Sequence, residues 1–178
     1  IVASGPNAAS PHHEAADRVI QPGEGVLFDI GGTMVGDDGV GYCSDITRCV
    51  WIGPHPEREF LEAYAVLHEA QRASVASATV GTPAEEVDRE GRGRIADAGF
   101  GSYFVHRTGH GIGVEAHEDP YIVEGNTEPL TAGNAFSIEP GIYVPGRFGM
   151  RLEDIVVATD DGPDPLNVVD HHLAVVDA

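Results

Sequence analysis

Histidines concentrate in one glycine-rich stretch of the chain, 106–120, which reads H-R-T-G-H-G-I-G-V-E-A-H-E-D-P. The middle histidine, His110, stands between two glycines, so a metal or a substrate can approach it closely. A glycine-rich surface loop with incidental histidines is the simpler interpretation of any single His-Gly pair. Because His106, His110 and His117 all fall within twelve residues, we expect a site, provided that other segments supply further ligands.

Two carboxylates interrupt the first pair of strand-like segments. Asp29 lies in the apolar run 26–30 and Asp45 in the run 42–52, and the Gly-Asp-Asp-Gly sequence between the runs predicts a β-hairpin. Alternation of side chains along the strands places both carboxylates on one face of this hairpin. Like charges that face each other are destabilising unless a cation lies between them, so this pair is a candidate cation site.

The second pair of strand-like segments has the same character. Segment 134–144 carries Glu139 in its apolar middle, segment 150–158 carries Glu153, and a turn at 146–149 predicts another hairpin. Isolated buried carboxylates are costly in free energy. The candidate site therefore combines five side chains: Asp29, Asp45, His110, Glu139 and Glu153. This mostly oxygen donor set suits a pair of divalent ions, as in two-metal hydrolases.

Two amphipathic helices separate the hairpins. Apolar residues recur at helical spacing from about 56 to 79, and the sequence Thr-Pro-Ala-Glu from Thr82 predicts a capped start for a second helix that ends near Ala98. Neither helix carries residues with an evident chemical role, so we expect both to serve packing. The order of elements predicts an α+β fold, in which a curved antiparallel sheet carries the site on its concave face and the helices pack behind it.

Composition narrows the class of protein. The chain has 178 residues, 42% of them hydrophobic and 22% charged, which is enough for one folded domain, 1–178. Its formal net charge of −19 argues against nucleic acid or an anionic membrane as a partner. No apolar run approaches the length of a membrane span. Cys43 and Cys49 lie too far apart along one expected strand for a disulfide, so we expect reduced thiols in a cytoplasmic protein.

Five motifs in this chain resemble, in the same order, those of the pita-bread metallopeptidases, the family of methionine aminopeptidases, Xaa-Pro aminopeptidases and prolidases. They are D-I-G-G at Asp29, S-D-I-T-R at Asp45, G-H-G-I-G-V-E-A-H-E at His110, S-I-E-P-G-I-Y at Glu139 and R-L-E-D at Glu153. Arg151 and the I-E-P-G-I-Y form resemble the Xaa-Pro branch rather than the methionine aminopeptidases. The resemblance covers residues 1 to about 165 and implies the creatinase/aminopeptidase fold, with helices on the convex side of the sheet.

The resemblance also sets two expectations about the ends and lengths of segments. In the family, helices of the fold precede the position that corresponds to Ile1, and the whole enzyme also has a separate N-terminal domain. We therefore expect an N-terminally truncated catalytic domain. Asp29 and Asp45 are 16 residues apart, which is longer than the family's usual interval because of an acidic insertion near 36–40. A longer hairpin loop would leave the strand pairing and the ligands in place.

For metal binding, the resemblance implies a distinct role for each matching residue. Asp29 would chelate one ion, and Asp45 and Glu153 would bridge both ions. His110 and Glu139 would complete the second ion, and Glu139 would also accept a proton from the attacking water. The implied cofactors are two divalent ions, manganese foremost, with cobalt, zinc or iron as alternatives.

For the substrate, the resemblance implies a pocket that accepts a peptide or dipeptide with proline in second place. His117 would contact the substrate and stabilise the tetrahedral intermediate as a hydrogen-bond donor. His106 is expected to be both catalytic and substrate-binding. The expected lining of the pocket is His12, His106, His117, Arg151 and Tyr143.

The implied activity is dinuclear-metal-dependent cleavage of the bond between an N-terminal residue and proline, with a homodimer as the expected state of the full-length protein. Three alternatives stay open. They are an inactive pita-bread binding module with a vacant metal site, a methionine aminopeptidase-like enzyme, and the metal-free branch typified by creatinase. Retention of all five candidate ligands argues against the first and the last of these. The sequence does not separate a dipeptidase from an aminopeptidase.

Overall fold

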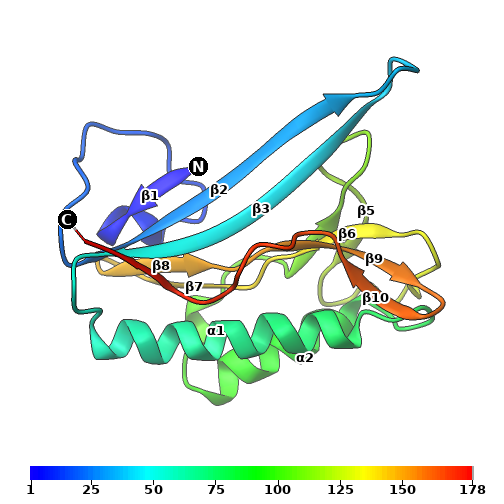
Figure 1. Ribbon diagram of the computed structural model, residues 1–178. Helices are drawn as coiled ribbons and strands as arrows, with labels where there is room; N and C mark the ends of the chain where they lie inside the picture. The colour runs from blue at the N-terminus through cyan, green and yellow to red at the C-terminus, as the bar shows by residue number, and fades with distance from the viewer. Residues whose placement is uncertain (178) are drawn as a thin grey trace.

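The computed structural model describes residues 1–177 and shows two helices packed against three β-sheets (Figure 1). The helices are α1 (Arg58–Ser77) and α2 (Ala84–Asp97), and the 3-10 helices are η1 (Gly5–Ala9) and η2 (Gly101–Tyr103). The strands are β1 (Val2–Ser4), β2 (Glu24–Val35), β3 (Gly41–Ile52), β4 (Gly109–Gly111), β5 (Glu118–Ile122), β6 (Ala135–Ile138), β7 (Gly141–Val144), β8 (Phe148–Arg151), β9 (Asp154–Thr159), β10 (Gly162–Pro165) and β11 (Ala174–Val176).

The strands are arranged in the orders β1-β2-β3-β11, β10-β9-β6-β4-β5 and β7-β8. Neighbouring strands run antiparallel except β3 and β11, which are parallel. In Figure 1 both helices lie along one side of the sheets, and the β2–β3 hairpin projects on the other side. The predicted α+β class with helices behind the strands is confirmed, although the single curved antiparallel sheet consists in detail of three sheets with one parallel pair.

The first hairpin is longer than the sequence pattern indicated. β2 and β3 pair without interruption from Glu24 with Ile52 to Val35 with Gly41. The turn closes through a hydrogen bond from the Gly36 N–H to the Val40 carbonyl oxygen at 2.8 Å. The acidic insertion therefore lengthens the hairpin and leaves the pairing intact, as predicted.

The second hairpin is broken where the sequence predicted continuous strands. Glu139 and Pro140 separate β6 from β7, and Leu152 and Glu153 separate β8 from β9. The prediction of unbroken strands over 134–144 and 150–158 was wrong. Pro140 has no N–H to donate to a neighbouring strand, so the ladder is interrupted at this point.

The two breaks turn the backbone of each glutamate toward another element. The Glu139 N–H donates to the Thr108 carbonyl oxygen at 2.7 Å, just before β4. The Glu153 N–H donates to the Thr47 carbonyl oxygen of β3 at 3.2 Å, and these two residues form an isolated bridge. Each glutamate is thereby fixed at a junction between segments that are distant in the sequence.

The helices share the apolar core beneath the first sheet with residues of the strands. Phe60 of α1 is 1% exposed and packs on Trp51 of β3 and Phe148 of β8, with ring centroids 5.0 and 5.3 Å apart.

The predicted capping role of Thr82 was wrong, because α2 begins after Pro83 and the Thr82 hydroxyl instead bonds the Thr79 hydroxyl at 2.9 Å. Within the described residues, neither helix is long and apolar enough to span a membrane.

Gly109 allows β4 to approach β6 at very close range. A Cβ atom at this position would lie 1.8 Å from the Ser137 carbonyl oxygen. We expect Gly109→Ala to push the strands apart and lower the free energy of unfolding by about 1–3 kcal/mol, the usual cost of overpacking. Chemical denaturation measures the change.

Gly93→Ala is the matched control for this substitution. A Cβ atom on Gly93, inside α2, would meet nothing within 4 Å. Alanine is the better helix former, so this variant should gain about 0.5–1 kcal/mol. Equal stability of the two variants would contradict the close approach of β4 to β6.

Candidate metal centre

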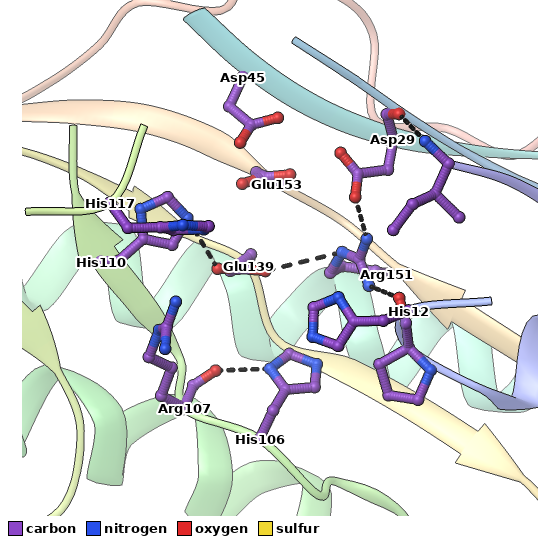
Figure 2. A pocket seen from close by; sticks show the side chains of 12 residues that line it. His12, Asp29, Asp45, His106, Arg107, His110, His117, Glu139, Arg151 and Glu153 are labelled. Carbon is purple, nitrogen blue, oxygen red and sulfur yellow. Dashed lines mark hydrogen bonds and ion pairs between the residues drawn. The ribbon is translucent and has the colours of Figure 1, made fainter. Parts of the chain in front are cut away.

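One pocket of about 460 Å³ gathers almost all of the residues that the sequence singled out (Figure 2). Its wall consists of Ile1, Pro11, His12, Asp29, Asp45, His106, Arg107, His110, His117, Glu139, Arg151 and Glu153. The five candidate ligands, the three histidines of the glycine-rich stretch, His12 and Arg151 are thus brought together. Of the predicted site residues, only Tyr143 is not part of this wall.

The ligand candidates reach the pocket from five separate segments. Asp29 lies on β2 and Asp45 on β3, where Asp45 pairs with Gly31, so the two carboxylates are diagonal neighbours on one face of the hairpin. His110 lies at the centre of β4. Glu139 and Glu153 occupy the two breaks in the second hairpin.

Three of these side chains form the tightest group. Asp45, His110 and Glu153 each offer a ligand atom, and these atoms lie within 4.8 Å of one another. Glu139 adjoins the group, with its Oε1 atom 3.3 Å from the His110 Nε2 atom. Asp29 stands at the edge, because its Oδ2 atom accepts a hydrogen bond from the Arg151 Nη2 atom at 2.5 Å (Figure 2).

The buried carboxylates of the pocket resist ionisation. Burial, and secondly the charge of Asp29, raises the pKa of Asp45 to about 6. Burial raises the pKa of Glu139 to about 7 and outweighs the opposing attraction of Arg151. Burial together with the charges of Glu139 and Asp45 raises the pKa of Glu153 well above its ordinary value. A cation among these groups would relieve the repulsion that opposes their ionisation.

His110 is in the protonation state that a metal ligand needs. Burial lowers the pKa of its ring to about 4, so the imidazole is neutral at pH 7. Its Nδ1 atom lies 3.0 Å from the Gly111 carbonyl oxygen, which can only accept a hydrogen bond. The proton therefore resides on Nδ1, and the lone pair of Nε2 faces Glu139 and the pocket.

A second histidine, His106, is oriented from behind by Tyr143. The His106 Nδ1–H donates to the Arg107 carbonyl oxygen at 2.6 Å, so its Nε2 atom accepts from the Tyr143 hydroxyl at 2.8 Å. The same hydroxyl accepts from the Arg151 Nη1 atom at 2.8 Å. Tyr143 is 2% exposed and lies behind the wall of the pocket. It was predicted to contact the substrate, but in this position it supports His106 and Arg151 instead.

Sequence reasoning missed the part that α2 plays in holding the histidine segment. Arg92 donates to the His106 carbonyl oxygen at 2.8 Å and pairs with Asp88 at 2.8 Å. Asp88 is 1% exposed and accepts from the Thr108 N–H at 3.2 Å. The sequence signal that could have indicated this role is the pair of Asp88 and Arg92, four residues apart on the apolar face of a helix. That helix was expected to contribute only packing. Arg107, between these two anchored residues, lines the pocket and was also missed.

The residues present fit a divalent metal centre. Carboxylate oxygens and a neutral imidazole nitrogen are the ligands that manganese, zinc, cobalt and iron accept. The clustered carboxylates with raised pKa values and the pre-oriented His110 nitrogen are physical signs of a site built for cations.

Comparison with known proteins decides the family. Residues 1–160 match metallopeptidase family M24. The chain belongs to this family. It is 51% identical over 176 residues to the probable dipeptidase PepE of Mycobacterium tuberculosis, covering 99% of the chain and 46% of that protein. It is 47% identical to the Xaa-Pro dipeptidase of Lactobacillus delbrueckii subsp. lactis, with the same coverage of 99% and 46%.

Similarity to a solved structure agrees with membership of this family. Dipeptidase PepE from Mycobacterium ulcerans superposes with a TM-score of 0.95 at 52% identity and covers 100% of this chain and 47% of that one. The expected pita-bread fold and the resemblance to the prolidase branch are therefore confirmed. The chain spans about half the length of the curated relatives it matches.

The raised pKa values make a prediction about the pH dependence of metal binding to this M24 domain. At pH 6 the metal-free protein holds protons on most of Glu139 and on part of Asp45, whose pKa values are about 7 and about 6, and a metal must displace them. Manganese affinity should therefore fall as the pH drops from 8 to 6, with release of one or more protons per site. Titration calorimetry in buffers of different ionisation enthalpy measures both quantities. Affinity that does not change over this range would contradict the assigned protonation states.

Proposed function

We propose that this chain is the catalytic domain of a two-metal peptidase that cleaves the bond between an N-terminal residue and proline. The proposed ligands are Asp29, Asp45, His110, Glu139 and Glu153. The observation that carries the proposal is the meeting of these five side chains, from five separate segments, in one pocket. The proline preference is supported by the similarity to the Xaa-Pro dipeptidase of Lactobacillus delbrueckii subsp. lactis.

Two divalent ions in this pocket would activate a water molecule and polarise the scissile carbonyl. The chain itself would manage the protons. Glu139 is the proposed acceptor of the proton that the water loses, and it would return that proton to the leaving amine. Its carboxylate lines the pocket beside His110, where it can accept a proton and then donate it. Arg151, whose Nε atom lies 3.7 Å from Glu139 Oε2, would hold the carboxylate in place.

His117 is the proposed donor to the developing oxyanion. It is exposed at the pocket, and its ring contacts that of His110 edge-on with centroids 4.2 Å apart. A donor in this place would be worth most in the transition state. His12, His106 and Arg107 would line the part of the pocket that receives the peptide.

The remaining features of the proposal follow from composition and donor type. Manganese is the proposed native metal, because four of the five ligands are carboxylates. Cytoplasmic location is supported by Cys43 and Cys49, which are both free thiols. The formal charge of −19 argues against nucleic acid as a partner. The homodimer of the full-length protein stays a prediction.

The direct test is hydrolysis of Xaa-Pro dipeptides and Xaa-Pro tripeptides by the full-length protein with manganese added. We expect cleavage before proline, and the ratio of the two rates assigns the enzyme as a dipeptidase or an aminopeptidase. Asp45→Ala should lose metal and activity together, because a bridging carboxylate serves both ions. A wild-type protein that binds no metal and cleaves neither substrate would support the alternative of an inactive binding module with a vacant metal site.

A pair of variants separates the roles of the two neighbouring histidines. His117→Ala should keep its metal content, whereas kcat should fall by about 100- to 1000-fold, the usual loss of one transition-state donor. His110→Ala should weaken metal binding itself. Metal analysis and steady-state kinetics of both variants are the measurements. If both variants lose metal equally, His117 is a ligand and the assignment is wrong.

A further inference from the structure

The two hairpins that carry the candidate ligands meet at a narrow junction. Asp45 lies on β3 of the first sheet, and Glu153 lies next to β9 of the second. One backbone bridge joins them, between Thr47 and Glu153, and it is reinforced by the Thr47 hydroxyl, which donates to the Glu153 carboxylate at 2.6 Å. Arg151 of the second hairpin also donates to the Asp29 carboxylate at 2.5 Å and to the Thr47 hydroxyl at 3.2 Å. Two further side chains reinforce this junction.

The side chain of Asn167 links β3, which carries Asp45, to β9, which directly follows Glu153. Its Nδ2 atom donates to the Asp45 carbonyl oxygen at 3.1 Å, and its Oδ1 atom accepts from the Ile155 N–H at 2.6 Å. The preceding residue, Leu166, donates its N–H to the Ile155 carbonyl oxygen at 2.8 Å. The chain after β10 therefore runs alongside both strands at the point where they meet.

Arg48 makes a second link at the same junction. Its Nη1 atom donates to the carbonyl oxygens of Thr47 at 2.9 Å and Glu153 at 2.7 Å. Its Nε atom donates to the Asp170 carbonyl oxygen at 3.1 Å, and its Nη2 atom to that of Val169 at 2.9 Å. One guanidinium group thus joins β3, the Glu153 break and the C-terminal segment.

The contacts of Arg48 are anchored by a buried carboxylate. Asp154 is 1% exposed and accepts from Arg48 Nη2 at 2.7 Å and from Gln71 of α1 at 2.8 Å. The ring of His171 is the third partner of Asp154. The three donors fix Asp154, which directly follows Glu153.

From these contacts we infer that segment 166–171 positions the carboxylates of Asp45 and Glu153 for metal binding, through Asn167 and Arg48. Neither of these two residues lines the pocket, so both act through the ligands. Hydrogen bonds behind metal ligands typically account for about 10- to 100-fold in metal affinity. The inference rests on the proposed metal-dependent function.

Asn167→Asp tests the inference with little change of shape. The variant keeps an oxygen that accepts from Ile155 N–H, but it loses the donor to the Asp45 carbonyl oxygen. In the full-length protein we expect manganese affinity to fall by about 10- to 100-fold and the visible spectrum of the cobalt-loaded protein to change. Val168→Ala is the matched control, because Val168 is 96% exposed and adjacent in sequence. It should bind metal as the wild type does.

Arg48→Lys is the second test and applies even if Asn167→Asp does not fold. Lysine keeps the positive charge near Asp154 but cannot donate to both Thr47 and Glu153 with the planar geometry of arginine. It should lower metal affinity in the same direction. If either folded variant binds manganese with wild-type affinity and an unchanged cobalt spectrum, and loses only thermal stability, the segment is merely structural and the inference is wrong.

The two proposals can fail separately. If wild-type protein does not cleave Xaa-Pro peptides and the Asn167→Asp variant still loses metal affinity, the proposed activity is wrong and the positioning role holds. If wild-type protein cleaves them and the variant keeps full metal affinity, the positioning role is wrong and the activity holds.

Discussion

Repulsion among buried carboxylates is the constraint on which the pocket depends. Asp45, Glu139 and Glu153 converge from different segments, and burial raises the pKa of each. Without any cation these groups are harder to ionise than carboxylates in water, and Glu139, whose pKa is about 7, would be about half protonated at pH 7. A resident pair of divalent ions would remove this cost, so metal binding and the integrity of the junction between the hairpins are linked.

The protein offsets part of this repulsion with its own cation. Arg151 is 2% exposed, donates to Asp29 and Tyr143, and lies beside Glu139. A buried guanidinium with three such partners is satisfied in the absence of metal. Because Arg151 contacts Asp29 and Glu139, Asp45 and Glu153 are the carboxylates whose negative charge is least compensated by a neighbouring positive charge. This pair lies next to His110. The most unfavourable electrostatic point of the pocket is therefore also the place where a neutral imidazole nitrogen is available.

The sequence was informative where the determinants are local. Alternation in the two hairpins, helical periodicity and the motifs around Asp29, His110 and Glu153 predicted the elements and the residues that line the pocket. It was uninformative where long-range contacts decide. The breaks at Glu139 and Glu153 arise from pairing with Thr108 and Thr47, which no local pattern encodes.

Side chains with two possible environments were also misjudged. Tyr143 was expected to face the substrate and instead lies behind the pocket wall, and no sequence pattern indicated that His171 contacts the buried Asp154. Both depend on which segments pack behind the site. The central claim, that the carboxylates at the hairpin junction hold a pair of cations, is tested most directly by anomalous diffraction from crystals of the full-length protein soaked in manganese. The account predicts two anomalous peaks in the pocket, both within coordination distance of Asp45 and Glu153. A single peak, or peaks that touch neither carboxylate, would contradict it.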